Sequence, residues 1–390
     1  MRALRSNRSN PWRLFFWIAS SFLLAMTLSC HNSSRKTSGH NYHLSDNEIT
    51  TAQGIAIYRS DDFVKITIKN PWQGASNVSY DHYLIPKGSP VPDGIDTSMV
   101  IFVPIETIVC MSTTHASMIS ALGETATIKG MSGVNLVYSA EINKLEIDEI
   151  GYESNLNTEV LIKISPDLIM MYGIGNESLG HINKMREIGI KTMFNADYLE
   201  EKPLGKAEWI KLFGELYCKR HIADSIFTSI VNEYDSLKKY IHNNITHRPL
   251  TLLGLPFKDT WFVSPGNSFI SALINDAGGE YLWKDTHSNV SMPYSLESVF
   301  IKAVNADYWL NIGTVENASE ITMLDRRLGT LKSFTNGQLY NNNNRVTKNG
   351  GNDFWESGAL SPQIILKDIA SILHPELFPE YVPYYYKRLN

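Results

Sequence analysis

Small polar residues directly follow two of the strands that the first half of the sequence predicts. Residues 105–111 predict a buried strand, and the polar run 112–115 comes immediately after it. Residues 168–172 predict a second strand, which ends in a tyrosine. Open α/β sheets bind ligands at the carboxyl ends of their strands. We therefore expect ligand contacts from Thr113, Thr114, His115 and Tyr172.

Three polar residues could bind a metal or offset a charged ligand: His115, Arg345 and Lys348. His115 could ligate an iron or cobalt centre, although a lone histidine in a loop more often serves as a hydrogen-bonding residue. Arg345 and Lys348 lie in the polar stretch 341–352 and could offset an anionic ligand. Charges on such an asparagine-rich loop are also often simply solvated.

The second half of the sequence supplies aromatic candidates: Trp261, Tyr294, Phe354 and Trp355. Large flat rings bury much area at low entropic cost, so they suit bulky ligands. Aromatic residues also fill cores, and Trp261 fits that interpretation best.

Enzyme signatures are missing. Gly173, Gly175 and Gly180 do not have the spacing of a dinucleotide-binding loop. Ser236 and Lys239 form an S-x-x-K pattern, but they lie within a predicted amphipathic helix. No C-x-x-C, H-E-x-x-H or G-x-S-x-G occurs. We therefore expect no catalytic residues, no cofactor and no metal centre held by the protein.

Composition excludes further classes. The 390 residues are 43% hydrophobic and carry a formal net charge of −5, from 35 Lys+Arg and 40 Asp+Glu. That balance argues against a nucleic-acid binder, because phosphate neutralisation needs a basic face. Three cysteines exclude a disulfide framework, so we expect Cys110 and Cys218 to be buried thiols.

The first thirty residues are typical of an export signal. Arginines precede the apolar stretch 14–28, which is shorter than the roughly 20 residues of a membrane-spanning helix. Small residues lead to Cys30, as in a bacterial lipoprotein signal, where that cysteine is lipidated. An ordinary cleaved signal or an uncleaved anchor is the alternative. We expect a signal peptide at 1–30, a flexible tether at 31–50 and a lipid-anchored periplasmic protein.

The remaining patterns predict two α/β lobes. Residues 54–58 and 63–68 alternate as a small N-terminal β-hairpin. Strands and helices alternate afterwards in the expected lobes 51–204 and 246–390, which indicates parallel sheets. Helical spacing without proline predicts one long bridging helix in the region 205–245.

The two lobes show a weak internal repeat. In the first lobe, a helix that begins near Glu159 leads to Asp167 and an apolar strand. In the second lobe, a helix near Glu297 leads to Asp307 and another apolar strand. Such helix–strand units also repeat by chance in α/β proteins.

Five segments in this order resemble the class III periplasmic substrate-binding proteins of ABC importers: residues 112–130, 157–169, 208–210, 293–297 and 351–362. The resemblance implies two Rossmann-like lobes joined by a single long backbone helix, with a ligand in the cleft between them. The family's ligands are iron–siderophore complexes, haem and vitamin B12.

The resemblance also implies roles for individual residues. Glu159 and Glu297 match the family positions at which one acidic residue on each lobe docks to an ABC permease dimer. The alternative is that each glutamate only favours the positive end of its helix dipole. Tyr294 matches a position where vitamin B12 receptors place an aromatic ring, and Phe354 and Trp355 lie near another.

Together these features predict a solute-binding lipoprotein that captures a metal chelate, of the ferric siderophore type, and delivers it to an ABC permease. A vitamin B12 or haem receptor is the close alternative. An extracytoplasmic enzyme that uses the same cleft is the alternative of another class.

Overall fold

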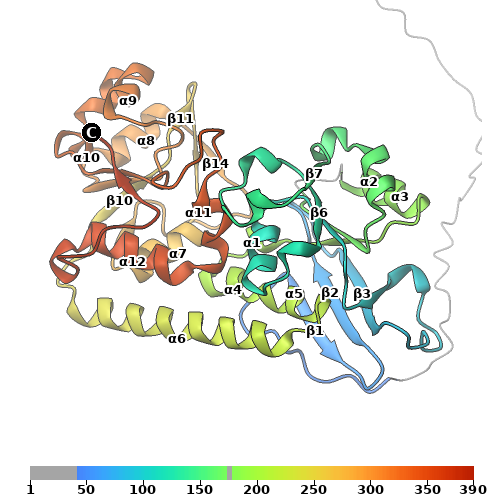
Figure 1. Cartoon of the computed structure of the whole chain (residues 1–390). Coiled ribbons are helices and arrows are strands. Elements are labelled where there is room, and N and C mark those ends of the chain that lie inside the picture. The colour runs from blue at the N-terminus through green and yellow to red at the C-terminus, as the bar shows by residue number, and fades with distance from the viewer. Residues whose placement is uncertain (1–41, 174–177) are drawn as a thin grey trace, which may run out of the picture. The chain divides into compact units, whose positions relative to one another are not determined.

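The computed structural model describes residues 42–173 and 178–390 (Figure 1). The expected signal peptide, Cys30 and residues 31–41 of the expected tether lie outside the described residues. Two large apolar cores organise the described part, one built mainly from residues 49–231 and the other from residues 234–389. We call the parts around these cores the first and the second lobe. The prediction of a two-lobed α/β fold is therefore confirmed.

A four-stranded sheet opens the first lobe, in the order β1-β2-β3-β4. Its strands are β1 (Ile55–Arg59), β2 (Val64–Lys69), β3 (Ser79–Pro86) and β4 (Val100–Val103). β1 and β2 form the predicted antiparallel hairpin, with Ile57 opposite Ile66. Both isoleucines are buried in the core, whereas Asp61 and Asp62 in the turn are exposed.

A five-stranded parallel sheet follows, in the order β7-β6-β5-β8-β9. Its strands are β5 (Ile108–Cys110), β6 (Ile128–Met131), β7 (Asp148–Glu149), β8 (Leu168–Met171) and β9 (Thr192–Phe194). Its helices are α1 (Thr113–Ala121), α2 (Thr158–Ile164) and α3 (Ser178–Glu187). All four residues of β8 are buried, as a central parallel strand requires. α1 ends before Gly123, whose φ of 72° fits the left-handed position that favours glycine.

The predicted bridging helix is three helices in the structure: α4 (Pro203–Glu208), α5 (Ile210–Leu216) and α6 (Arg220–Asn244). The chain turns between α5 and α6 at Cys218, which adopts a left-handed φ of 54°. The turn packs α6 closely against Gly214, where an added Cβ would lie 2.6 Å from that of Ala223. Cys110 is a buried free thiol as expected, but Cys218 is exposed.

α6 contributes to both cores. Its 25 residues span roughly 37 Å, and Figure 1 shows it running along both lobes. Phe227 and Ile230 pack in the first core, whereas Tyr234 and Ile241 pack in the second. Within the described ranges, no helix combines the length and the apolar character that crossing a bilayer requires.

The second lobe contains a five-stranded sheet in the order β13-β10-β15-β16-β17 and a three-stranded antiparallel sheet in the order β11-β12-β14. The larger sheet consists of β10 (Leu250–Leu253), β13 (Glu280–Tyr281), β15 (Tyr308–Leu310), β16 (Leu339–Asn341) and β17 (Lys387–Arg388). The smaller consists of β11 (Pro256–Phe257), β12 (Thr260–Val263) and β14 (Met292–Ser295). The helices are α7 (Phe269–Asp276), α8 (Leu296–Ala303), α9 (Ala318–Leu324), α10 (Lys332–Thr335), α11 (Asp353–Glu356) and α12 (Pro362–Leu373).

The lobes are joined at a second place besides α6. After α11 the chain returns to the first lobe, where Ala359 and Leu360 pack in its core. The expectation that one long helix alone joins the lobes is therefore incomplete. Periodicity along one helix cannot reveal this contact, because its partners are distant in the sequence.

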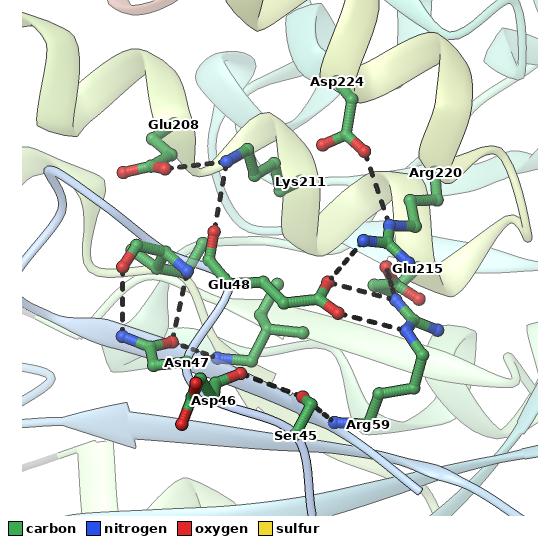
Figure 2. Close-up of polar contacts among 12 residues, drawn as sticks. Ser45, Asp46, Asn47, Glu48, Arg59, Glu208, Lys211, Glu215, Arg220 and Asp224 are labelled. Atoms are coloured by element: carbon green, nitrogen blue, oxygen red, sulfur yellow. Dashed lines mark hydrogen bonds and ion pairs between the residues drawn. The ribbon is translucent and has the colours of Figure 1, made fainter. Parts of the chain in front are cut away.

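Residues 45–54, which we call the N-terminal strap, bind across the helices of the first lobe. Figure 2 shows the contacts of its first part, residues 45–48. The carboxylate of Glu48 lies 3.2 Å from Arg59 and 3.1 Å from Arg220. Arg59 also pairs with Glu215 of α5 at 2.7 Å. Lys211 donates a hydrogen bond to the main-chain oxygen of Glu48. These contacts fix the strap between the hairpin and the start of α6.

Two buried carboxylates accept hydrogen bonds from five successive main-chain N–H groups of the strap. Glu208 accepts from the N–H groups of residues 50, 51 and 52 at 2.9, 2.7 and 2.9 Å. Glu200 accepts from those of residues 53 and 54, and from the indole of Trp209 at 3.0 Å. Lys211 lies 2.8 Å from Glu208 and neutralises its charge. The strap is therefore held without forming a strand or helix at these residues.

Candidate functional site

A cleft of about 1360 Å³ lies between the two lobes and is lined by residues of both. The first lobe lines it with the strap, the loop that follows β2, and the segments after β8 and β9. The second lobe lines it with the segments after β10, β15 and β16 and with α11. A cavity of this size can hold a bulky small molecule.

The carboxyl ends of several parallel strands open into this cleft. In the second lobe, Gly254 follows β10, Asn311 follows β15 and Asn342 follows β16. In the first lobe, Tyr172 follows β8 and Ala196 lies just after β9. This is the edge at which α/β sheets bind ligands, because their turns leave side chains and main-chain groups free.

Aromatic side chains line both walls of the cleft: Trp72, Tyr172, Tyr198, Phe269, Phe354 and Trp355. The rings of Tyr172 and Tyr198 lie 4.8 Å apart. Phe354 is buried, and its ring supports Trp355 edge-to-face at 4.8 Å. Trp355 is 58% exposed, so its ring offers the largest free apolar surface of this set.

Side-chain amides and balanced charges supply the polar part of the lining. The amides are Gln53, Asn70, Gln73, Asn267, Asn289, Asn311, Asn342, Asn343 and Asn352. The charged residues are three lysines and three glutamates: Lys69, Lys206, Lys387, Glu200, Glu201 and Glu316. Arginine, histidine and aspartate do not occur among the described lining residues. The lining is therefore close to neutral, and its donors and acceptors come mainly from amides.

Protein ligands for a bare metal ion are not gathered in the part of the chain that the structure describes. Within it, no three His, Cys, Asp or Glu side chains lie close enough together to hold a metal ion. The amide and aromatic groups of the cleft are poor ligands for a transition metal.

Hydrogen bonds bridge the two sides of the cleft. The amide of Asn267 donates to Glu201 at 2.5 Å, and the amide of Gln73 donates to the main-chain oxygen of Asn289 at 3.5 Å. Each bond joins a residue of the first lobe to a residue of the second. They limit how far the lobes stand apart in this structure.

A tighter contact, which we call the lobe junction, joins residues 136–139 of the first lobe to residues 351–356 of the second. Glu356 is buried and accepts from the N–H groups of Tyr138 and Ser139 at 2.6 and 2.8 Å. Burial raises the pKa of Glu356, and these two hydrogen bonds oppose that shift. Gly351 lies so close to Leu136 that an added Cβ would be 2.0 Å from its main-chain oxygen.

Three of the predicted ligand residues belong to the neighbourhood of this junction. Thr113 and Thr114 begin α1 and are half-buried, and Thr114 donates its hydroxyl hydrogen bond to the main-chain oxygen of Trp355 at 2.9 Å. Arg345 forms an ion pair with Asp353 at 2.6 Å and lies over the rings of Tyr138 and Tyr384. None of the three lines the cleft, so we propose that they position its wall.

The structure places three further candidates away from the cleft. His115 is buried, its ring nitrogens have no partner among the described residues, and burial lowers its pKa to about 3. Trp261 is buried, stacks on Trp309 and donates to the main-chain oxygen of Leu253 at 3.0 Å. Tyr294 is half-buried on β14 beside Trp283. We therefore leave all three out of the proposed contacts.

Tyr172, Phe354 and Trp355 do line the cleft, whereas Glu159 and Glu297 lie outside it. Glu159 is exposed in the first turn of α2, and Glu297 is exposed in the first turn of α8. Their positions on the surface are compatible with contacts to a protein partner.

The amides that follow β15 and β16 and the loop of residues 69–75 were not predicted from the sequence. A signal existed for Asn311 and Asn342, because each comes directly after an apolar strand. No comparable signal marks Asn70 or Trp72, since that loop reaches the cleft only through the packing of the N-terminal sheet within the first lobe.

Comparison with known proteins agrees with this architecture. A family model described as periplasmic binding protein matches residues 108–327. That match covers more than half of the 390 residues. The chain therefore belongs to the periplasmic binding protein family, whose members bind solutes.

Individual relatives are distant. An uncharacterized lipoprotein of Methanocaldococcus jannaschii is 27% identical over 323 residues, which cover 78% of this chain and 75% of that protein. A possible iron-binding periplasmic solute-binding protein of Staphylococcus epidermidis superposes with a TM-score of 0.56 at 16% identity, covering 70% of this chain and 99% of that chain. A periplasmic haem-binding protein of Pseudomonas aeruginosa gives 0.53 at 14% identity, covering 70% and 93%. At such identities the two structures support the fold alone.

Proposed function

We propose that this chain is the solute-binding lipoprotein of an ABC importer and that it captures a ferric siderophore in the cleft. The cleft itself carries the proposal: it is large, lies between two lobes, and presents aromatic rings and amides. Because the described residues hold no cluster of metal ligands, a chelated metal suits the cleft better than a free ion. The possible iron-binding protein and the haem-binding protein with a similar fold are consistent with this class of ligand.

The charge of the lining narrows the kind of chelate. The lining contains three lysines and three glutamates, and two of the glutamates already accept hydrogen bonds within the protein. A strongly anionic ligand would need an excess of cationic donors, which arginine usually supplies. We therefore propose a ferric complex of low net charge, such as a trihydroxamate, in preference to an anionic tricatecholate.

Vitamin B12 and haem remain the alternatives within the family. Cobalamin is bulky and carries many amide groups, which the amide-rich lining could match. Haem carries two carboxylates, and Lys69, Lys206 and Lys387 are the cationic groups available for them. Arg345, which the sequence offered for this purpose, is already paired with Asp353.

An enzyme in the same cleft finds no support among the described lining residues. Acyl or phosphoryl transfer needs a nucleophile within hydrogen-bond reach of a base. Serine and threonine hydroxyls are present in the lining, but none of those described is hydrogen-bonded to a glutamate or histidine.

A calorimetric titration with four probes tests the proposal: a neutral ferric trihydroxamate, a ferric tricatecholate, haemin and cyanocobalamin. We expect the trihydroxamate to bind at least about tenfold more tightly than the tricatecholate, because only the latter leaves net charge unpaired in the cleft. Stronger binding of the tricatecholate would contradict the charge argument. Binding of none of the four would contradict the proposed ligand class.

Trp355→Ala should weaken binding of the tightest probe by about tenfold or more, because an exposed, rigidly supported ring is removed from the cleft wall. Phe262→Ala is the matched control, since Phe262 is an exposed aromatic of the same lobe that does not line the cleft. The same calorimeter measures both variants. Equal losses in both, or no loss in either, would show that Trp355 does not contact the ligand.

We further propose that Cys30 is lipidated, that the strap attaches the folded part to this anchor, and that the protein works in the periplasm. The named lipoprotein among the relatives supports the anchor. The strap supports it because its ion pairs would hold the end of the tether firmly to the fold.

The delivery step is proposed to use Glu159 and Glu297 as docking points for the two permease subunits. The internal repeat supports this pairing. Asp167 accepts from the N–H group of Thr107 at 3.1 Å, and Asp307 accepts from that of Leu250 at 2.8 Å, so each helix–strand unit is fixed to its sheet in the same way. Equivalent glutamates on equivalent units suit a partner with two-fold symmetry.

Charge reversal at both positions, Glu159→Lys with Glu297→Lys, should abolish ligand-dependent stimulation of the permease ATPase in proteoliposomes. The reason is that attractive charges steer and align the encounter, whereas like charges oppose it. Ligand binding in solution should stay within about twofold, because neither residue lines the cleft. Loss of ligand binding, or normal stimulation, would contradict the docking roles.

A further inference from the structure

The two proposed docking glutamates have different surroundings. Glu159 has no ion-pair partner among the described residues, and its side chain is exposed on α2. Glu297 lies 3.4 Å from both terminal nitrogens of Arg327. Both members of this second pair remain more than half exposed, at 64% and 51% of their side chains. A partner could therefore reach Glu297 without unfolding any element.

Arg327 is held in place by a different residue, Asp325. Its Nε donates to Asp325 at 3.0 Å and one terminal nitrogen donates at 2.7 Å, which is a bidentate pair. Asp325 also accepts from the main-chain N–H of Arg327 at 2.8 Å, where the 3-10 helix Arg326–Thr330 begins. These hydrogen bonds hold the pKa of Asp325 below its usual value. The guanidinium is thus fixed by Asp325, while its contact with Glu297 is the longer and weaker one.

We propose that Arg327 is an intramolecular competitor for Glu297, so that the docking point of the second lobe is neutralised until a cationic group of the permease displaces Arg327. The inference rests on the proposed docking role of Glu297. It makes docking sequential: Glu159 engages first, and Glu297 engages by exchanging one guanidinium partner for another. Exchange is feasible because an exposed ion pair contributes little stability.

Apolar side chains beside the two glutamates fit a protein partner. Ile301 lies one turn after Glu297 on α8 and is 74% exposed, and Met323, just before Asp325, is 80% exposed. On the first lobe, Ile162 lies one turn after Glu159 and is also exposed. A permease subunit that covers these residues would exclude water from the ion pairs between the glutamates and its own cationic groups. Those pairs would be strengthened, which favours the exchange at Glu297.

A cycle of variants tests the competitor. The full-length cognate permease–ATPase complex is immobilised in nanodiscs, and the binding of the solute-binding protein to it is measured. The protein is tested in three backgrounds, wild type, Glu159→Gln and Glu297→Gln, each with and without Arg327→Gln. We expect Arg327→Gln to increase affinity about threefold in the first two backgrounds and to have no effect in the third. The increase should appear mainly in the association rate and should shrink at high salt.

An equal effect of Arg327→Gln in the Glu297→Gln background would overturn the inference, because the gain would then not pass through Glu297. No gain in any background, with the wild type binding normally, would also overturn it while leaving the proposed function intact. If the wild type itself does not bind the permease, both the proposed function and this inference fail. Asp325→Asn is a second variant, which should lower the affinity instead, because Arg327 keeps its charge and Glu297 becomes its remaining carboxylate partner.

Discussion

Glu208→Gln is expected to lower the free energy of unfolding by about 3 kcal/mol at pH 7. The carboxylate is fully buried and accepts from three successive N–H groups of the strap, besides the ammonium of Lys211. Glutamine has an NH2 group in place of one of the two accepting oxygens. That group would face these donors and leave at least one of them without an acceptor. Urea denaturation followed by circular dichroism measures the loss.

The same residue should make stability depend on pH. Burial alone would raise the pKa of Glu208, but the hydrogen bonds from Lys211, Ala52, Thr50 and Thr51 outweigh it and hold the pKa below its usual value. A carboxyl with a lowered pKa stabilises the fold above its unfolded pKa, and this contribution is lost as the pH falls through the lowered value. Glu208→Gln should therefore flatten the acid limb of the stability curve.

Glu146→Gln is the matched control, because Glu146 is an exposed glutamate of the same lobe. Its effect should stay within about 0.5 kcal/mol. A Glu208→Gln variant as stable as this control would show that the strap is not fastened through Glu208.

Gly351→Ala is expected to lower both stability and ligand affinity, by about 2 kcal/mol and about tenfold. The added Cβ would lie 2.0 Å from the main-chain oxygen of Leu136 and 2.6 Å from its carbonyl carbon. Main-chain atoms cannot move aside as a flexible side chain can, so the lobe junction must open. Opening separates Glu356 from its two N–H donors and displaces Trp355 in the cleft wall.

Thermal unfolding and calorimetric titration of the tightest probe measure the two losses. Gly180→Ala is the control, because nothing lies within 4 Å of an added Cβ there and the residue belongs to a helix. Alanine at that position should be neutral or slightly stabilising. Unchanged affinity in Gly351→Ala would mean that the junction does not set the shape of the cleft.

Periodicity and turn residues were enough to predict the elements that have a strong local pattern. Alternation around Asp61 and Asp62 predicted the hairpin, and the apolar run of β8 predicted a buried parallel strand. Polar residues after strands predicted the edge of the sheets that lines the cleft, and Tyr172 lies there. These features follow from neighbouring residues, which a sequence displays directly.

The features that fix the cleft depend on residues far apart in the sequence. Glu208 meets the strap across more than 150 residues, and Glu356 meets Tyr138 across 218. The same polar run after β5 that was expected to contact the ligand turns instead to the lobe junction, through Thr114. Residue type alone could not distinguish Trp355, which lines the cleft, from Trp261, which lies in the core. Both are tryptophans, and tryptophan occurs in cores as well as on binding surfaces.

The position of a bound metal tests the central claim most directly. Crystals of the protein with the tightest-binding ferric complex, measured at the iron absorption edge, locate the metal by its anomalous signal without reference to the chelator. We predict a single strong peak in the interlobe cleft, between the ring of Trp355 and the loop that carries Asn70. A peak outside the cleft, or iron coordinated directly by protein side chains, would contradict the account.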